Sequence, residues 1–155
     1  MRASLVSVLA IAAVVFSGCF ITLSQKEIDA REAKCAATQT IRFMPAFFYG
    51  FDYADLEKIE VKQVRGDKTI DTFWVYPAIW RGKNGEARAD ARIYDREFNL
   101  SDSYHFTILG KQTFVATDIK MGLRTQYSCE IVSVKIDGVE SDYTAFYKSG
   151  YKKPD

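Results

Sequence analysis

The sequence predicts a mainly β fold: an antiparallel β-sandwich, or a partly open barrel, of about six to eight strands with one short N-terminal helix. Two observations lead to this prediction. Three pairs of segments with alternating apolar and polar residues follow one another, each pair joined by a short turn. Aromatic residues make up 14% of the chain and are mostly Phe and Tyr, which favour strands over helices.

The predicted helix begins with a capping box, in which Ser24 and Glu27 satisfy each other's backbone N–H groups. We expect the helix to cover residues 25–37. Ile28 and Cys35 are seven residues apart and therefore share one face of it. This face places the cysteine where it can meet the β-sheets.

Three predicted β-hairpins supply most of the strands. Their arms are residues 56–64 and 69–76, residues 104–109 and 112–121, and residues 126–136 and 139–147. The third hairpin has the clearest turn signal, because Asp137-Gly138 favours the positive φ of both central positions in a type I′ turn.

Two further segments are assigned less directly. Residues 40–44 form an expected short strand before Pro45. Residues 86–98 alternate as a strand does, and their spacing also fits a helix. The Asn84-Gly85 turn ahead of them favours the strand.

The start of the chain has the features of an export signal. Arg2 precedes an apolar stretch over residues 5–15. The next residues, Phe16-Ser17-Gly18-Cys19, resemble the lipobox of bacterial lipoproteins, with Phe in place of the usual Leu. The resemblance implies that residues 1–18 are a signal peptide that is removed. It also implies that Cys19 becomes an N-terminus carrying acyl chains such as palmitate.

An uncleaved membrane anchor and a simple cleaved signal are the alternatives. Residues 3–23 carry no charge and are long enough to cross a bilayer as a helix. Serine, glycine and threonine dilute this stretch, and nothing strongly basic or aromatic marks its far end. The lipobox is the preferred interpretation, and two or three acyl chains anchor a protein durably at about 0.8 kcal/mol per buried CH₂.

The charge balance excludes one class of partner. Removal of residues 1–18 takes away one cation, Arg2, and leaves 20 Lys and Arg against 20 Asp and Glu. A neutral chain lacks the basic surface that nucleic acids require, so no nucleic-acid partner is expected. The remaining residues 19–155 suffice for one domain.

Lipidation of Cys19 leaves two cysteines, Cys35 and Cys129. An even pair in an exported protein predicts a disulfide bond, and two buried free thiols are the alternative. No CxxC motif marks either residue as a redox catalyst.

Residues for catalysis and metal binding are scarce. His105 is the only histidine, and no nucleophile motif or phosphate loop accompanies it. Asp95, Glu97 and Asn99 alternate as in a calcium loop, but Leu100 occupies the position of the required glycine. We therefore expect a protein that is not an enzyme, with no catalytic residue, no metal site and no cofactor.

Aromatic residues are the best candidates for a binding surface. Phe47, Phe48, Tyr49 and Phe51 are close together in the sequence, and Trp80 lies farther along the chain. Such rings can form an exposed platform for a glycan, a peptide or a partner protein. They can equally close one open end of the core, and the sequence leaves both interpretations open.

Residues 104–132 loosely resemble the small β-sandwich domains of envelope lipoproteins, such as transthyretin-like and carboxypeptidase-regulatory modules. The likeness lies in the spacing of the strands and in a cysteine before a late strand. It implies a fold and no function.

These expectations combine into a non-catalytic lipoprotein, held to the membrane by acylated Cys19 and binding an envelope protein or glycan. Phe20 stands where an aspartate would retain a lipoprotein in the inner membrane, so resemblance to sorted lipoproteins implies the outer membrane, facing the periplasm. The alternative is an immunity or inhibitor lipoprotein that protects the envelope against a hydrolase. Its loop over residues 77–88 would then enter the cleft of that enzyme.

Overall fold

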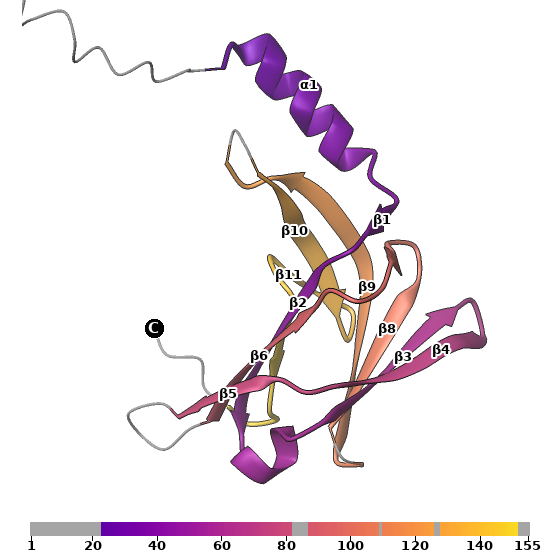
Figure 1. Cartoon of the computed structure of the whole chain (residues 1–155), viewed down its shortest axis with the longest axis vertical. Helices are drawn as coiled ribbons and strands as arrows, with labels where there is room; N and C mark the ends of the chain where they lie inside the picture. Colours follow the sequence, from indigo (N-terminus) through magenta and orange to yellow (C-terminus); the bar gives the residue numbers. More distant parts are fainter. Residues whose placement is uncertain (1–22, 82–86, 109, 126–127, 152–155) are drawn as a thin grey trace, which may run out of the picture.

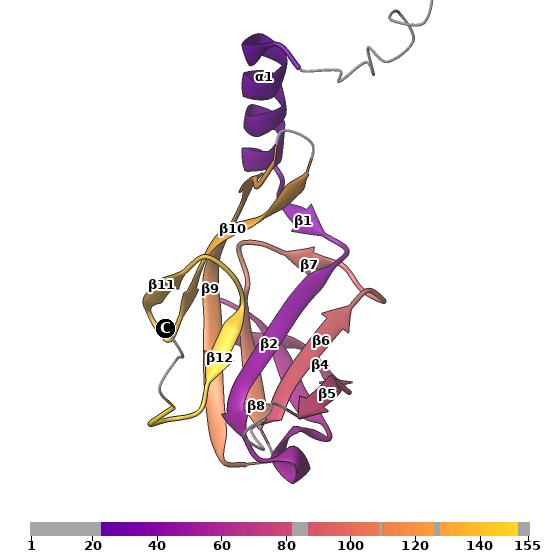
Figure 2. The same ribbon diagram turned by 90° about the vertical axis from the view of Figure 1, so that its left-hand side faces the viewer.

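A computed structural model describes residues 23–81, 87–108, 110–125 and 128–151. The predicted lipobox and the Asn84-Gly85 turn lie outside these residues. In the described part, a six-stranded and a four-stranded β-sheet pack face to face, two short strands form a third sheet, and one helix projects from the end of the sandwich (Figures 1 and 2). The predicted mainly β sandwich is therefore confirmed.

The elements are named in chain order. The helices are α1 (Gln25–Ala36) and the short 3₁₀ helix η1 (Tyr53–Leu56). The strands are β1 (Thr40–Ile41), β2 (Met44–Phe51), β3 (Ile59–Arg65), β4 (Lys68–Val75), β5 (Ala78–Arg81), β6 (Ala87–Ile93), β7 (Phe98–Asn99), β8 (Ser103–Ile108), β9 (Gln112–Leu123), β10 (Cys129–Ile136), β11 (Val139–Ser141) and β12 (Ala145–Tyr147). Seven of the strands in the described segments have six residues or more, within the predicted six to eight, and the others are short.

The larger sheet has the order β11-β10-β9-β8-β3-β4 and is antiparallel throughout. It contains the three predicted hairpins β3–β4, β8–β9 and β10–β11. Asp137 and Gly138 both have positive φ, 51° and 84°, as the predicted type I′ turn requires. Gly138 adopts this conformation without the steric cost that a Cβ would bring.

The smaller sheet has the order β12-β2-β6-β5 and lies across the larger one (Figure 2). Strand β6 settles the ambiguity of residues 86–98 in favour of a strand up to Ile93. The short strand expected over residues 40–44 is instead β1, followed by β2, which runs through Pro45 and the aromatic cluster. Proline is tolerated there because β2 has no neighbouring strand on that side of Pro45.

The second arm of the third predicted hairpin is wrong beyond Ser141. The chain turns at Tyr143, whose carbonyl accepts a hydrogen bond of 2.8 Å from the N–H of Ala145. It then crosses to the smaller sheet, where β12 pairs parallel to β2. The crossover buries Phe146 between the two sheets. A continuous hairpin arm would have kept this residue in the larger sheet.

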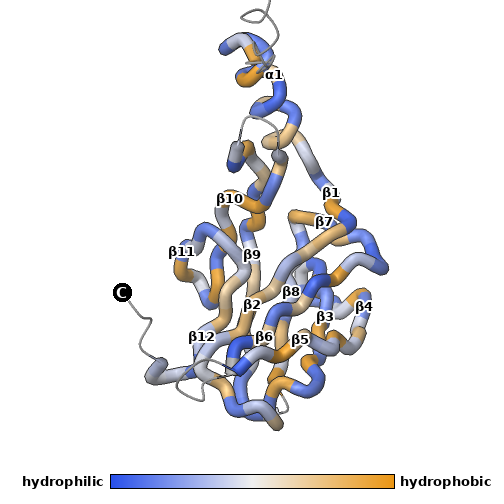
Figure 3. Tube along the Cα trace, turned by 60° about the vertical axis from the view of Figure 1, so that its left-hand side comes forward, coloured by the Kyte–Doolittle hydropathy of each residue, from blue (hydrophilic) through white to orange (hydrophobic). Residues whose placement is uncertain are grey.

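The core lies between the facing sides of the two sheets. Alternate residues of β2, β3 and β8 point inward, and Figure 3 shows hydrophobic and hydrophilic residues alternating along several strands. Phe146 is fully buried, with its ring centroid 4.9 Å from Phe48, 4.6 Å from Phe106 and 5.2 Å from Phe114. This aromatic cluster joins β12 and β2 of one sheet to β8 and β9 of the other.

Helix α1 is held to the sandwich by the predicted disulfide. It begins at the predicted cap, where the Glu27 carboxylate accepts hydrogen bonds from the Ser24 N–H at 2.8 Å and hydroxyl at 2.7 Å. Cys35 is the one buried residue of the helix and is bonded to Cys129 of β10, with 5.6 Å between the Cα atoms. Ile28, on the same face, is half-buried and the other helix residues are exposed, so the disulfide is the main link between α1 and the sheets.

Candidate functional site

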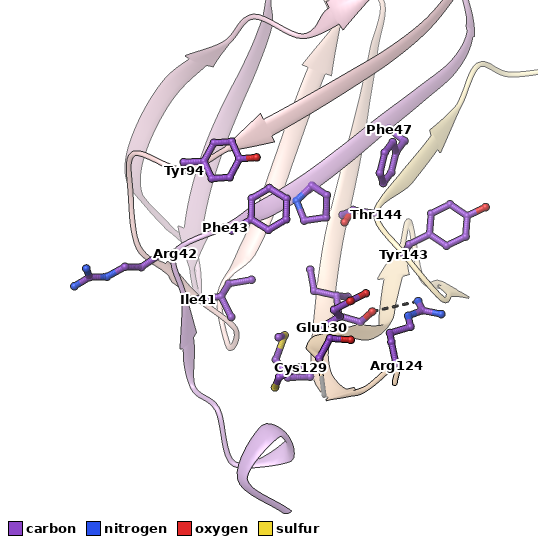
Figure 4. A pocket seen from close by; sticks show the side chains of 14 residues that line it. Ile41, Arg42, Phe43, Phe47, Tyr94, Arg124, Cys129, Glu130, Tyr143 and Thr144 are labelled. Carbon is purple, nitrogen blue, oxygen red and sulfur yellow. Dashed lines mark hydrogen bonds between the residues drawn. The ribbon is translucent and has the colours of Figure 1, made fainter. Parts of the chain in front are cut away.

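A pocket of about 920 Å³ lies at the end of the sandwich from which α1 projects. It opens between β2 and the β9–β10 hairpin, next to the disulfide (Figure 4). Its lining is mostly apolar and consists of Ile41, Arg42, Phe43, Pro45, Phe47, Tyr94, Met121, Arg124, Ser128, Cys129, Glu130, Ile131, Tyr143 and Thr144. Size and lining are typical of sites that bind small molecules or apolar groups of larger ones.

Strand β2 builds one wall of the pocket. Its even-numbered residues enter the core, so Pro45 and Phe47 point to the opposite, outer face, as does Phe43 just before the strand. Phe43 stacks on Tyr94, with ring centroids 4.8 Å apart and planes 17° apart. Phe47 meets Tyr143 edge-on at 6.1 Å. These contacts fix aromatic surfaces around the opening.

The β9–β10 hairpin and the crossover after β11 build the opposite wall. Met121 and Ile131 contribute apolar side chains. The Arg124 guanidinium donates a hydrogen bond to the carbonyl of Ile131 at 3.2 Å (Figure 4). It also donates to the carbonyl of Asp142. Arg124 thereby ties the crossover to the hairpin and fixes the width of the pocket on this side.

Thr144 gives the pocket an unusual polar group. The residue is fully buried, and its hydroxyl has no hydrogen-bond partner among the described residues. An unsatisfied buried hydroxyl costs about 1–3 kcal/mol. The hydroxyl is covered by its neighbours, so a bound group would reach it only after these side chains had moved.

The backbone at the pocket is unsuited to pairing with an added strand. Phe47 donates its N–H to the carbonyl of Thr144 at 2.9 Å, so this edge of β2 faces β12. Pro45, two residues earlier, faces the same edge and has no N–H to donate. The pocket is therefore built to take side chains or an apolar ligand instead of a β-strand.

The titratable groups of the pocket are Arg42, Arg124, Glu130 and the two tyrosines. The described lining contains no histidine and no free thiol, and Cys129 is in the disulfide. Among the described residues of the chain, no group of three or more metal ligands is found. The polar groups that the lining offers a ligand are therefore two guanidinium groups, one carboxylate and two phenols, besides the covered Thr144 hydroxyl and Ser128.

His105 and the acidic segment near it are engaged in structural contacts. The His105 ring is 3.4 Å from the Ser103 hydroxyl. Asp102, close to the calcium-like segment, is buried and accepts hydrogen bonds from Arg65 at 2.8 and 3.0 Å and from Gln63 at 2.6 Å. The hydrogen bond from Arg65 lowers the pKa of the Asp102 carboxyl, which therefore stays charged. Asp102 thereby links the start of β8 to the end of β3.

Three of the five predicted binding residues share the outer face of the smaller sheet. The register places Tyr49 opposite Arg88 and Arg88 opposite Trp80. The Arg88 guanidinium lies 5.8 Å from the centroid of Phe47 and 5.6 Å from that of Tyr49. Burial raises the pKa of the Tyr49 phenol. Phe47 and Tyr49 are thus half-buried under neighbouring side chains, and Trp80 is exposed.

Phe48 and Phe51, the other two, are in the core. Their side chains are 0% and 4% exposed. Phe48 follows from the two-residue period of β2, and the register shift after Tyr49 brings Phe51 inward as well. Neither ring can touch a partner in this fold, and both belong to the interpretation in which the rings close the core.

A second, smaller cleft lies on the same outer face, over β5 and β6. It has a volume of about 430 Å³ and is lined by Tyr76, Ala78, Trp80, Asp90 and Arg92. The sequence pointed to Trp80 alone among these residues. Among the predicted binding residues, Phe47 lines the larger pocket, whose other walls come from segments far apart in the chain.

Comparison with known proteins finds no matching family model, no matching curated protein and no matching solved structure. The site therefore has to be interpreted from its own geometry. None of the helices in the described segments is long and apolar enough to cross a bilayer.

Proposed function

We propose that this protein is a non-catalytic lipoprotein of the bacterial envelope that binds an apolar group of another envelope component. Acylated Cys19 holds it to the membrane, and in a host with two membranes it belongs to the outer one and faces the periplasm. The apolar pocket between β2 and the β9–β10 hairpin is its binding site.

The pocket carries this proposal. Its aromatic and aliphatic walls surround a volume in the range of ligand sites, and the buried Thr144 hydroxyl lacks a partner. An unfilled apolar surface of this kind is unusual for a chain that binds nothing. The charged residues of the lining, Arg42, Arg124 and Glu130, are few beside its apolar and aromatic residues, which favours an apolar group as the occupant.

Helix α1 supports the anchored arrangement. Its 12 residues span about 18 Å, and all but Cys35 avoid burial. Cys19 precedes the N-cap Ser24 by five residues. A solvated helix between the anchor and the pocket acts as a spacer, so the pocket opens toward the space next to the membrane.

Photocrosslinking in cells tests the binding site. A benzoylphenylalanine placed at position 43, on the pocket rim, is expected to form one discrete adduct with an envelope component. The same group at position 53, on η1 at the far end of the sandwich, is the control. The two natural residues have similar exposure, 41% for Phe43 and 50% for Tyr53. Equal adduct patterns at both positions, or no adduct at position 43, would contradict the assignment of the pocket.

Exposed Trp80 favours one alternative function, that of an immunity or inhibitor lipoprotein. The side chain is 61% exposed at the end of β5, where a hydrolase cleft could receive it. Co-expression with a panel of secreted envelope hydrolases separates the two functions. Protection that depends on Trp80 supports the alternative, and absence of protection across the panel counts against it.

A further inference from the structure

The cleft over β5 and β6 has two aromatic walls with a small residue between them. Tyr76, Ala78 and Trp80 alternate along an extended segment, so their side chains share one face. Tyr76 is 73% exposed and Trp80 is 61% exposed. Neither ring packs against another ring among the described residues. Two exposed aromatic rings beside one cleft are typical of a binding surface.

The spacing of the walls limits what fits. At about 3.3 Å per residue, Tyr76 and Trp80 are roughly 13 Å apart along the chain. Contact with a ring face requires about 4 Å on each side. Walls about 13 Å apart are wider than the roughly 8 Å at which one flat group would contact both, so a ring lies against one wall at a time and Ala78 leaves the middle of the cleft free.

The floor of the cleft pairs an acceptor with a donor. Asp90 lies opposite Ala78 in the sheet. Its two oxygens accept hydrogen bonds from Arg88 at 2.9 and 3.3 Å, which fixes the carboxylate and leaves further lone pairs free. Arg92, two residues along β6 on the same face, makes no hydrogen bond or ion pair with the described residues. Its guanidinium therefore keeps its donors for a ligand.

We propose that this cleft binds a neutral pyranose sugar of an envelope glycan. The C–H faces of a pyranose are apolar and lie against aromatic rings, while its hydroxyls project from the ring edge. One hydroxyl donates to Asp90 and another accepts from Arg92. A phosphate would pair with Arg92 but would also face the Asp90 carboxylate, whereas the hydroxyls of a neutral sugar can pair with both groups. A flat aromatic ligand would leave both polar groups unpaired. The proposal does not depend on acylation of Cys19 or on the pocket near the disulfide.

Two-dimensional NMR of the full chain, titrated with chitotriose, cellotriose and maltotriose, tests the proposal. At least one of these sugars is expected to shift the indole N–H of Trp80 and the amides of Ala78 and Asp90. The Kd should be on the order of 1 mM or tighter. Trp74, an exposed tryptophan on β4 of the other sheet, is the internal control and should not shift.

Two variants locate the contact. Trp80→Ala and Arg92→Gln should each weaken binding about tenfold, whereas Trp74→Ala should leave the Kd unchanged. Preserved spectra of the core residues show that the variants are folded. Absence of saturable shifts with all three sugars would overturn the proposal. So would binding that survives Trp80→Ala, or saturation of the cleft by an aromatic peptide alone.

Discussion

Replacing both Cys35 and Cys129 by serine is expected to lower the free energy of unfolding by about 4–5 kcal/mol. The two cysteines are 94 residues apart in the sequence, so the bond closes a long loop in the unfolded chain. In the chain-entropy model, a loop of this length restricts the unfolded state strongly. Chemical denaturation of the double variant and of the oxidised wild type, followed by tryptophan fluorescence, measures the difference.

The loss of the disulfide should act first on α1. Cys35 is the one buried residue of the helix, and Ile28 is half-buried. Without the disulfide, little apolar contact therefore holds α1 to β9 and β10. Hydrogen exchange should therefore show the amides of α1 exchanging freely, while those of β8 and β9 remain protected. A loss below 1 kcal/mol, or a helix that keeps its protection, would show that the bond adds little to the fold.

Phe146→Ala is expected to destabilise the protein by about 3–5 kcal/mol. The ring is fully buried and touches three other aromatic rings, which come from β2, β8 and β9. Its removal leaves a cavity at the point where β12 joins the two sheets. Thermal and urea unfolding of the variant and of the wild type measure the change in the free energy of unfolding.

Val139→Ala is the matched control for Phe146→Ala. Val139 belongs to β11, a few residues earlier, and is 71% exposed. Its truncation should change the unfolding free energy by no more than about 0.5 kcal/mol. An equal loss of unfolding free energy in both variants would show that the aromatic cluster does not connect the sheets.

The elements that depend on local sequence were predictable. A turn such as Asp137-Gly138 fixes a hairpin through its own φ values, and a cap such as Ser24 with Glu27 fixes the start of a helix. The pairing of Cys35 with Cys129 followed from there being two cysteines beside Cys19. None of these predictions requires knowledge of distant contacts.

The crossover to β12 was not predictable in this way. Residues 139–147 fit one hairpin arm, and nothing local marks Ser141 as its end. The break is favoured by burial of Phe146 against Phe48, a contact across almost a hundred residues. Tertiary packing outweighs the local pattern there.

The candidate sites were predicted in part. Aromatic content led to Phe47, Tyr49 and Trp80. The alternation of β2 explains why Phe48 is buried, and the register shift after Tyr49 explains why Phe51 is buried as well. For the pocket near the disulfide, Phe47 was the one predicted binding residue, because the walls combine separate segments whose other residues carry no motif. Only the fold brings them together.

The mass of the protein purified from the bacterial envelope tests the central claim, attachment through Cys19, most directly. We expect the mass of a chain that begins at Cys19 and carries a diacylglyceryl group and an acyl chain. Cys19→Ser should yield an unlipidated protein that leaves the membrane fraction. A wild-type chain of 155 residues, still carrying residues 1–18 and without added lipid mass, would contradict the claim.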